Sequence, residues 1–476
     1  MTVVHIRSYP QEGRRMLFVL PPAQKRTQKI RPSHHPIMTA TLVATAIAQH
    51  AHVGVIDAAL LGLSHEELLQ IIVSWQPEWI GFVPFEYRRE LPLEGTLELV
   101  SLLRSRGCTA QMGVLNASWG ALEPRRAVEQ QKLDFVAFGD CEPTISSLAN
   151  SPKSPPAGVL WRLSGYLEEN TRRPQVDWEQ LPIPAWFLFD YHAYIPSAHR
   201  YKHFPTLPVF ASRSCPYGCD FCPQSLFNPS QKHSTRPPEK VFAEVKVLHE
   251  HYGAKDIEFY DPTFGIKRED TLVLCTLMKS LGVSWSCYSR CDILDEQLIA
   301  AMAASGCHTI LFGVESADEE VRGRTNKELS HAEIQRAFSL CAEYGIHTIA
   351  SFILGLPKET PHTLKRTLRF ARTLNPTYAQ FHLARAFFDH EDWLRHGTIH
   401  EEWDVTDASV NGKAYTPHGF DQKSLHRWLM RSYLEFYLRP KKIAALAHTI
   451  QSPADIRRYL RGMYQISHHL LGQREA

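Results

Sequence analysis

Short apolar runs and amphipathic stretches alternate along the first 150 residues. The runs are rich in Val, Ile and Phe, and they predict strands at residues 15–20, 52–58, 79–85, 109–115 and 134–139. Between them, apolar residues recur at helical spacing and predict helices at residues 37–49, 65–74, 94–106 and 125–131. Strands separated by helices form parallel sheets that are covered on both faces. Residues 1–150 are therefore predicted to form a Rossmann-like α/β domain, a doubly wound parallel sheet that binds ligands beyond the carboxyl ends of its strands.

A second alternating series begins at residue 207, after a proline-rich stretch, residues 151–206, that is predicted to be a connector. The series predicts strands at residues 207–212, 256–260, 284–289, 308–314, 347–354 and 378–384. It predicts helices at residues 238–251, 269–281, 295–304, 331–344 and 360–373. These strands are too few for a closed eight-stranded barrel, so residues 207–388 are predicted to form an open, partial (β/α)6 barrel. Residues 389–476 are predicted to be mostly helical and to form a small cap.

The composition narrows the class of protein. Lys and Arg number 52 against 50 Asp and Glu in 476 residues, a formal net charge of +2, which argues against a basic nucleic-acid binder. The longest apolar stretch, residues 37–48, is too short to span a bilayer, and no secretory signal is expected. Eight of the ten cysteines follow residue 200, unlike a secreted disulfide framework. The sequence therefore predicts a soluble cytoplasmic protein without a transmembrane segment, in which clustered cysteines hold metal.

Three cysteines lie close together just after the first strand of the second series. Cys215, Cys219 and Cys222 form a Cys-x3-Cys-x2-Cys run, in which Gly218 allows a sharp turn. Three thiolates on one loop can converge on one soft metal centre, whereas iron–sulfur clusters are normally held by four cysteines. With three, one iron keeps an open position at which a ligand can bind. The run therefore predicts an iron–sulfur cluster that binds a further molecule.

Two other interpretations of these cysteines are a structural zinc site and three unrelated buried thiols. Zinc usually takes four ligands at paired spacings, and no second Cys-x2-Cys occurs in the chain. Cys287 and Cys291 lie on one face of a predicted strand, where the backbone is too extended to bring them together as a chelating pair. Both observations favour the cluster.

Cys215, Cys219 and Cys222, with the aromatic Phe221 before the last, resemble the signature of the radical S-adenosylmethionine (SAM) superfamily. The resemblance extends through residues 207–385. It implies a [4Fe–4S] cluster held by the three cysteines, with SAM bound to the fourth iron. It also implies reductive cleavage of SAM to methionine and a 5′-deoxyadenosyl radical, with electrons from an external low-potential donor.

Shorter motifs follow the cysteines in the order that the family has. Segments around Asp261, Arg290 and Glu315 are similar to motifs on the second, third and fourth strands, although Pro262 replaces one family acid. From the residues alone, an ion pair between Arg290 and Glu315 is as good an interpretation as a functional role. Asp261 alone is equally well interpreted as a turn or cap residue. The resemblance implies that Arg290 and Glu315 lie near the polar groups of SAM and that Asp261 belongs to the same site.

Two further positions are implied to lie near the nucleoside of SAM. Gly355 and Leu356 are similar to the fifth-strand motif and would border the adenosine, while Phe221 would lie near the adenine. From the residues alone, Gly355 before Leu-Pro is interpreted as the end of a strand.

A doubly wound domain joined to such a barrel resembles the cobalamin-binding subclass of the superfamily, and this likeness covers most of the chain. Residues 138–142 resemble a Gly-Glu-Gly-Glu turn of the subclass, and residues 436–440 resemble a motif of anaerobic magnesium-protoporphyrin cyclase-like and hopanoid-modifying members. The chain differs at the Asp-x-His-x-x-Gly cobalt-binding motif, because Ala59 stands where the His would be. The expected cobalamin-binding residues are Pro84, Phe85, Leu115, Asn116 and Gly139. The alternative is that these are ordinary loop residues of a domain that binds no corrinoid.

The sequence therefore predicts a radical SAM enzyme that abstracts hydrogen from an unreactive carbon and favours cobalamin-dependent methyl transfer. Radical cyclisation, oxidation or rearrangement without methyl transfer is the alternative. An iron–sulfur electron-transfer or sensor protein and a zinc-stapled binding protein are alternatives of other classes. The expected substrate is a sizeable, partly apolar small molecule such as a lipid, a tetrapyrrole or a natural-product intermediate. No nucleic-acid partner is expected.

Overall fold

The computed structural model describes residues 6–21, 34–84, 93–117, 122–163, 165–197, 199–222, 233–386, 391–400, 413–448 and 456. Contacts between residues divide the chain into two compact units. Unit 1 comprises Met1–Pro196 and Leu226–Gln231, and unit 2 comprises Ser197–Ser225 and Lys232–Ala476. Among the described residues, no helix has both the length and the apolar character needed to cross a membrane.

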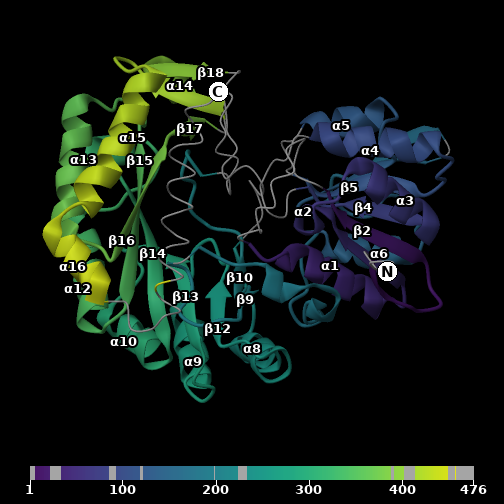
Figure 1. Ribbon diagram of the computed structural model, residues 1–476, viewed down its shortest axis with the longest axis horizontal. Coiled ribbons are helices and arrows are strands. Elements are labelled where there is room, and N and C mark those ends of the chain that lie inside the picture. The colour runs from purple at the N-terminus through teal and green to yellow at the C-terminus, as the bar shows by residue number, and fades with distance from the viewer. Residues whose placement is uncertain are drawn as a thin grey trace. The chain divides into compact units, whose positions relative to one another are not determined.

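Unit 1 is built on a mixed sheet with the strand order β1-β3-β2-β4-β5-β6-β7-β8. Figure 1 labels three neighbouring strands of this sheet, β2, β4 and β5. Its strands are β1 (Arg7–Tyr9), β2 (Arg15–Leu20), β3 (His52–Asp57), β4 (Trp79–Phe82), β5 (Gln111–Ala117), β6 (Phe135–Phe138), β7 (Val159–Leu163) and β8 (Tyr166–Glu169). The central strands β3-β2-β4-β5-β6 are parallel, and β1, β7 and β8 are added through antiparallel pairs. Since β2 has β3 on one side and β4 on the other, the chain reverses direction across the sheet between β2 and β4. Doubly wound domains bind ligands at this switch point.

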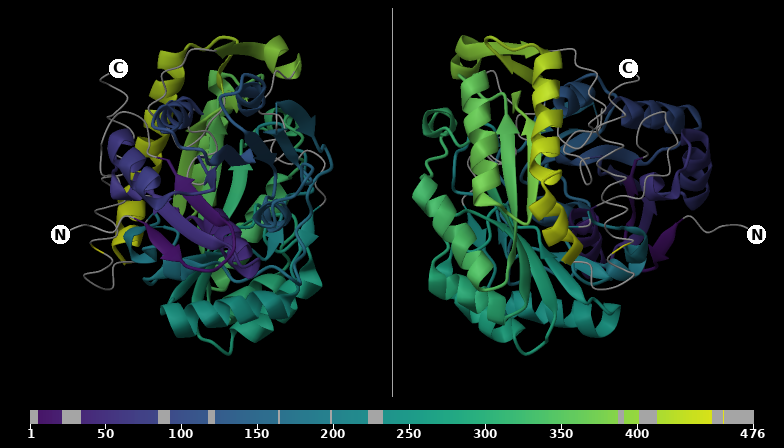
Figure 2. Two further views of the ribbon diagram at one scale, coloured as in Figure 1. Left: turned by 90° about the vertical axis from the view of Figure 1, so that its right-hand side faces the viewer. Right: turned by 60° about the vertical axis from the view of Figure 1, so that its left-hand side comes forward.

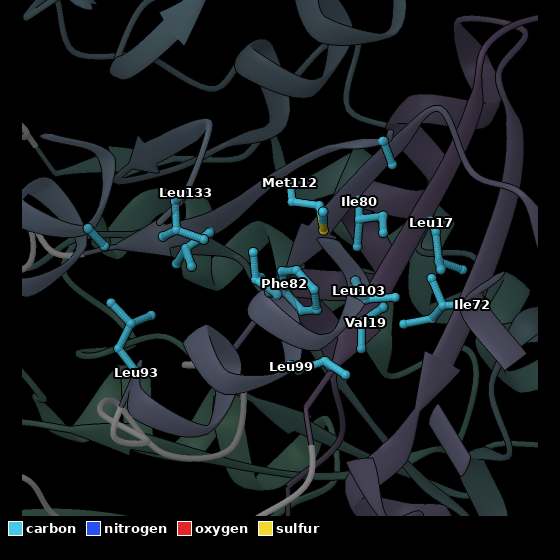
Figure 3. Packing of buried hydrophobic residues seen from close by; sticks show 14 of the residues in the cluster. Leu17, Val19, Ile72, Ile80, Phe82, Leu93, Leu99, Leu103, Met112 and Leu133 are labelled. Atoms are coloured by element: carbon cyan, nitrogen blue, oxygen red, sulfur yellow. The ribbon is translucent and has the colours of Figure 1, made fainter. Parts of the chain in front are cut away.

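The helices of unit 1 cover both faces of the sheet. They are α1 (Ile37–Ala48), α2 (Ala58–Leu61), α3 (His65–Trp75), α4 (Leu93–Ser105), α5 (Leu122–Glu129) and α6 (Glu142–Ala149), followed by short 3-10 turns at Trp186–Leu188 and Tyr191–Ala193. Figure 3 shows the buried side chains of β2, β4 and β5 packed against apolar residues of α3 and α4, among them Ile72 and Leu103. On the other side, α1 packs against α6. This core holds the strand ends of the carboxyl edge in place.

Unit 2 is built on a six-stranded parallel sheet with the order β16-β15-β14-β13-β12-β9. Its strands are β9 (Thr206–Val209), β12 (Asp256–Phe259), β13 (Ser284–Ser289), β14 (Cys307–Glu315), β15 (His347–Leu354) and β16 (Tyr378–Leu383). The connecting helices are α8 (Pro238–Tyr252), α9 (Arg268–Met278), α10 (Glu296–Ala304), α11 (Glu319–Gly323), α12 (His331–Glu343) and α13 (Pro361–Leu374). Each strand pairs with its predecessor in this series, and β9 does not pair with β16. The sheet is therefore an open, partial (β/α)6 barrel, as the sequence predicts.

The two faces of this sheet differ in exposure. On β14 and β15 the residues facing the helices are buried, whereas Leu311, Gly313, Ser351 and Ile353 on the opposite face are half-buried. The same alternation continues on β16. The inner face of the partial barrel is therefore accessible in unit 2.

The C-terminal part of unit 2 contains both helices and strands. A small antiparallel sheet with the order β17-β19-β18 combines β17 (Arg385–Ala386), β18 (Gly397–His400) and β19 (Lys413–Pro417), with α14 (Glu391–His396) beside it. The helices α15 (Gln422–Tyr437) and α16 (Pro440–His448) follow. Figure 2 shows α15 running alongside α13 and the edge strand β16.

Two tyrosines of α15 bind the backbone of β16. The hydroxyl of Tyr433 accepts from Phe381 N at 3.2 Å and donates to Phe381 O at 3.1 Å. Tyr437 does the same with Ala379, at 3.0 Å and 2.9 Å. These hydroxyls take the positions in which a neighbouring strand would supply donors and acceptors. They protect the free edge of the open sheet.

Most elements agree with the expected ones, and β13 and β15 have the predicted bounds. The differences lie in segments that were expected to be irregular or helical. Residues 151–206, expected to be a connector, contain β7 and β8, which extend the sheet of unit 1. Residues 389–476, expected to be mostly helical, also contain β18 and β19. Strands as short as these have little periodic signal of their own.

Candidate active site at the carboxyl edge of the six-stranded sheet

Parallel strands bring the expected SAM and cluster residues to one edge of unit 2. The cysteine loop follows β9 and the short strand β10 (Ser212–Arg213), which pairs with β11 (Ser234–Thr235). Arg290 follows β13, Glu315 ends β14, and Gly355 follows β15. The carboxyl ends of parallel strands lie on the same side of a sheet, so these loops face a common region.

The cysteine loop is anchored at both of its ends. Before it, the carboxylate of Asp261 accepts hydrogen bonds from Ala211 N at 2.8 Å and from the Ser212 hydroxyl at 2.5 Å. Near its other end, Asp220 N donates to Thr325 O at 3.1 Å, and Asn326 Nδ2 donates to the Asp220 carboxylate at 2.6 Å. The loop is therefore held from β12 on one side and from the segment after α11 on the other.

The sharp backbone turn of this loop occurs at its first residue. Ser214 has a φ of 63°, in the left-handed region that non-glycine residues rarely adopt. Gly218, expected to supply the turn, has no positive φ, and a Cβ there would meet no atom within 4 Å. The expectation for Gly218 was wrong because the chain turns where it leaves β10. Strained backbone of this kind persists where its surroundings hold it, often at functional sites.

Cys219 is the most enclosed of the three loop cysteines. Its side chain is buried, and Arg290 Nη1 donates to its Sγ at 4.0 Å. Burial raises the pKa of the Cys219 thiol to about 11, although the nearby charges of Lys327 and Arg290 act to lower it. Cys215 Sγ lies 3.4 Å from the Thr263 hydroxyl. A buried thiol beside two cations suits a thiolate that binds a metal centre, because the metal takes the place of the proton.

Arg290 and Glu315 do not pair with each other. Glu315 Oε1 lies 2.7 Å from Lys327 Nζ, and both side chains are buried. Arg290 instead forms a bidentate pair with Asp292, through Nε to Oδ1 at 3.0 Å and Nη2 to Oδ2 at 2.9 Å. The mutual ion pair that the residues alone allowed is therefore absent. Two separate cation–anion pairs lie on this edge of the sheet.

Backbone geometry at the end of β14 makes room for the first of these pairs. Glu315 has a φ of 65°. A Cβ on Gly313 would lie 2.2 Å from Glu315 Oε1 and 2.5 Å from Lys327 Nζ. A side chain at position 313 would therefore make the ends of the Glu315 and Lys327 side chains shift from the positions that they have here.

The turn after β15 is held by a buried carboxylate. Gly355 has a φ of 86°, which favours glycine. Glu359 Oε2 accepts from Gly355 N at 2.6 Å and from Leu356 N at 3.2 Å, and burial raises the pKa of Glu359 to about 8. Gly355 therefore lies in a tight turn directly after β15, and its contact with the adenosine stays a prediction.

Phe221 and Leu356 belong to one apolar cluster, while their contact with the nucleoside of SAM stays a prediction. Leu356 is fully buried, and Phe221 packs against the cluster with part of its ring exposed. The remaining buried members are Val321, Ala384, Ala386, Trp393 and Tyr415. Lys327 Nζ lies 5.7 Å from the centre of the Phe221 ring. The structure therefore brings the cysteine loop, the β14 end and the β15 turn together.

Asp261 occupies a different position from the other expected SAM residues. It is buried behind the loop, and both carboxylate oxygens accept hydrogen bonds from the segment that precedes the cysteines. Burial raises its pKa to about 7 against the effect of these hydrogen bonds. This geometry gives Asp261 a role in holding the loop. Its contact with SAM stays a prediction.

The donor set fits a four-iron cluster. Each thiolate of a four-iron cluster binds a different iron, so its cysteine sulfurs need not meet at one point. Three thiols on one anchored loop, one of them buried between two cations, match that requirement.

The carboxyl edge of unit 1 carries the expected corrinoid residues. Pro84 follows β4 at the switch point, Leu115 and Asn116 lie near the end of β5, and Gly139 follows β6, while Phe85 lies outside the described residues. Asn116 has a φ of 56°, and no group among the described residues forms a hydrogen bond with its buried Oδ1 atom. An unsatisfied buried acceptor at the ligand-binding edge fits a ligand with amide donors.

The segment at the position of the cobalt-binding motif forms a capped turn. Asp57 accepts from Leu60 N at 2.9 Å, which caps α2, and from the Tyr194 hydroxyl. Ala59 lies within α2, and Gly62 ends that helix with a φ of 67°. The Asp57 carboxylate therefore stabilises the local fold of unit 1.

Several residues of the unit 2 site were not expected from the sequence. Lys327, Asp292 and Glu359 each complete a contact of an expected residue, and Tyr217 stacks on Arg290. Asp292 and Glu359 had a local signal, since each lies in the same short motif as the expected residue that it contacts. Lys327 could not be found, because nothing in the sequence relates it to the end of β14.

Comparison with known proteins supports this description. Residues 209–371 match the model of the radical SAM superfamily. The chain is 25% identical over 445 residues to an uncharacterized methyltransferase of Pyrococcus horikoshii, covering 90% of this chain and 93% of the relative. It is 25% identical over 472 residues to the anaerobic magnesium-protoporphyrin IX monomethyl ester cyclase of Rubrivivax gelatinosus, covering 94% and 81%.

A solved structure shares the fold of nearly the whole chain. The cobalamin-dependent SAM radical enzyme OxsB, solved with aqua-cobalamin and SAM bound, aligns with a TM-score of 0.69 at 16% identity and covers 96% of this chain and 72% of its own. The open parallel sheet, the cysteine loop at its carboxyl edge and these similarities agree: residues 209–371 of this enzyme are a radical SAM domain.

Proposed function

We propose that the protein is a cobalamin-dependent radical SAM methyltransferase that acts on an unreactive carbon of a small molecule. The observation that carries the proposal is the three-cysteine loop at the carboxyl edge of an open sheet, in a chain whose other unit is a doubly wound sheet. A relative that covers nearly the same length is named a methyltransferase. Fold similarity to a cobalamin-dependent enzyme extends over both units.

Cys215, Cys219 and Cys222 are the proposed cluster ligands. Glu315, Gly355, Leu356 and Phe221 are the proposed contacts of SAM, because they lie on the same edge as the loop. When bound, the cluster and SAM supply a 5′-deoxyadenosyl radical that removes a hydrogen atom from the substrate. The residues of the chain position these groups, and the apolar cluster around Leu356 keeps water away from that side of the site.

The carboxyl edge of unit 1 is the proposed corrinoid site. Pro84, Leu115, Asn116 and Gly139 lie at the ends of neighbouring parallel strands, and Phe85 is proposed with them from its place in the sequence. Bound methylcobalamin would supply the methyl group. The backbone of Gly139, with a φ of 72°, and the unsatisfied Asn116 Oδ1 are the features that suit a large ligand rich in amides.

The substrate is proposed to enter along the inner face of the unit 2 sheet. Half-buried Leu311, Ser351 and Ile353 line this face together with Gln380 and His382 of β16. The face combines apolar and uncharged polar side chains, which suits a partly apolar molecule. Among the expected classes a tetrapyrrole is favoured over a lipid, because the relative from Rubrivivax gelatinosus is named for a magnesium-protoporphyrin ester.

An external low-potential electron donor is proposed to reduce the cluster. A reducing compartment, the cytoplasm, is proposed because the ten cysteines are unevenly placed, eight of them after residue 200, unlike a secreted disulfide framework.

The test is a turnover assay on protein purified anaerobically with hydroxocobalamin supplied. We expect four iron and four sulfide per chain, bound corrinoid, and 5′-deoxyadenosine and S-adenosylhomocysteine when SAM, reductant and a tetrapyrrole ester are added. SAM with a deuterated methyl group should transfer its label to the product. Cys219→Ala should abolish cluster and products, while Cys108→Ala, a cysteine of unit 1, should leave both unchanged.

Radical cyclisation without methyl transfer is the second candidate, and the cyclase relative favours it. Formation of 5′-deoxyadenosine without label transfer and without bound corrinoid would support it over methyl transfer. Absence of 5′-deoxyadenosine from protein with an intact cluster would instead support an electron-transfer or sensor role. Zinc in place of iron and sulfide would overturn all three.

A further inference from the structure

We propose that Arg290, anchored by Asp292, sets the reduction potential of the cluster on the cysteine loop and holds that loop in place. The proposal rests on the proposed function in one respect, namely that Cys219 is a cluster ligand. It assigns Arg290 to the cluster side of the site, as a positioning residue, in addition to the role near SAM that the family resemblance implies.

The Arg290 guanidinium makes contacts on every side. Its carbon lies 3.8 Å from the centre of the Tyr217 ring, in the middle of the cysteine loop. Its Nη1 atom donates to Cys219 Sγ at 4.0 Å, and its Nη2 atom donates to Glu328 O at 3.3 Å. Arg290 therefore links the end of β13 both to the loop and to the segment that anchors the loop.

Asp292 fixes the orientation of the guanidinium. Its two carboxylate oxygens bind Nε and Nη2 of Arg290, a bidentate geometry that only arginine can make. The remaining nitrogen, Nη1, is thereby turned toward Cys219. The Arg290 side chain is buried, so water screens its charge only weakly.

This arrangement acts on the electron that the cluster accepts. Reduction adds one negative charge to a cluster held by three thiolates, and a nearby cation stabilises the reduced form. Hydrogen bonds to the sulfurs and local net charge are the main protein controls on the potential of such clusters. Arg290 should raise the potential, and Asp292 should lower it by offsetting part of that charge.

Opposite shifts from the two partners distinguish an electrostatic role from a merely structural one. Arg290→Gln removes the cation, so the midpoint potential should fall. Asp292→Asn removes the anion and leaves the cation uncompensated, so the potential should rise. The double variant should return close to the potential of the unsubstituted protein. Loss of packing alone would not give shifts of opposite sign.

The measurement is a redox titration of the full chain, reconstituted anaerobically with iron and sulfide and followed by electron paramagnetic resonance without SAM. In Arg290→Lys the midpoint potential should stay close to that of the unsubstituted protein, because the positive charge remains. The variant should lose its cluster sooner, because lysine cannot form the bidentate pair with Asp292. Arg372→Gln is the matched control. It removes an exposed arginine from the carboxyl end of α13, at the opposite edge of the sheet, and should not change the potential.

Unchanged potentials, or shifts in one direction, in Arg290→Gln and Asp292→Asn would overturn the proposal while leaving the proposed function intact. If Arg290→Gln binds no cluster, the potentials of Arg290→Lys and Asp292→Asn decide the question. A higher midpoint potential in Asp292→Asn, with little change in Arg290→Lys, supports the proposal. A potential in Asp292→Asn that does not rise overturns it. Failure of the unsubstituted chain to bind a four-iron cluster would overturn the proposed function as well.

Discussion

Lys327 Nζ lies 2.7 Å from Oε1 of Glu315, and this buried ion pair joins the end of β14 to the segment that anchors the cysteine loop. Glu315 is one of the expected SAM contacts. Its carboxylate is held in place by a residue twelve positions later in the chain. The first prediction tests how far the site depends on this pair.

Lys327→Met leaves the Glu315 carboxylate buried without its cation. Removing one partner of a buried pair costs about 3–5 kcal/mol, so a loss of unfolding free energy of that order is expected in urea. Lys246→Met is the control, because the Lys246–Glu250 pair is exposed and spans 3.9 Å. An exposed pair contributes about 0–1 kcal/mol. Equal losses in the two variants would contradict the importance of the buried pair.

Stability should fall as the pH rises toward and beyond neutrality. The pKa of Asp261 is raised from 3.8 to about 7 by burial, so the folded chain keeps this proton where the unfolded chain has lost it. The stabilisation is therefore complete below the unfolded value and is lost as pH rises through about 7. Glu359, with a pKa of about 8, acts in the same direction.

Urea unfolding of Asp261→Asn across this pH range checks the sign. The asparagine carries no titrating proton, so the decline in stability should be shallower, with the contribution of Glu359 remaining. A slope as steep as that of the unsubstituted protein would show that Asp261 does not titrate in this window.

Gly355→Ala should disturb the turn that is proposed to border the adenosine. A left-handed alanine costs about 1–2 kcal/mol, and its Cβ would lie 3.1 Å from Leu425 Cδ1 of α15. Gly253→Ala is the matched control, since its φ is also positive but no atom lies within 4 Å of the added Cβ. We expect a larger stability loss in Gly355→Ala and, in equilibrium dialysis, weaker SAM binding in that variant alone. Equal SAM affinity in both would remove Gly355 from the site.

The double substitution Tyr433→Phe and Tyr437→Phe should weaken the edge of the open sheet. Each substitution removes a hydroxyl that serves both the N–H and the C=O of one β16 residue. A buried group deprived of its partner costs about 1–3 kcal/mol, so the double variant should lose several kcal/mol in urea and aggregate sooner on heating, by light scattering. Tyr344→Phe, which loses an exposed hydrogen bond to Glu296, should match the unsubstituted protein.

Much of the fold could be predicted because unit 2 has a simple local pattern. Each strand is a short apolar run, each helix follows at a regular distance, and strands pair in chain order. The cysteine loop could be predicted as a cluster site because its three ligands lie within one short segment. Gly355 and Leu356 could be placed directly after the fifth strand of this series because they belong to one short motif.

The contacts that organise the site could not be predicted. Lys327 was not expected to bind Glu315, and the residues alone allowed Arg290 as its partner instead. Which cation pairs with which carboxylate depends on side chains that come from different loops. The spacing of apolar and polar residues along the sequence carries no information about such pairs. The hydrogen bonds from the hydroxyls of Tyr433 and Tyr437 to β16 were likewise unexpected. The sequence of α15 has the pattern of an ordinary amphipathic helix, and only the structure shows that it lies beside β16.

The anchoring of the cysteine loop by Asn326 has a consequence for the synthesis of the protein. Asn326 follows Asp220, its partner in the loop, by 106 residues. At about 5–20 residues per second, translation takes roughly 5–20 s to cover that interval. During this time the three thiols are on the nascent chain without Arg290, Lys327 or Asn326 in place. Cluster delivery must therefore wait until most of unit 2 has left the ribosome, or the early thiols must be shielded from stray metal and oxygen until then.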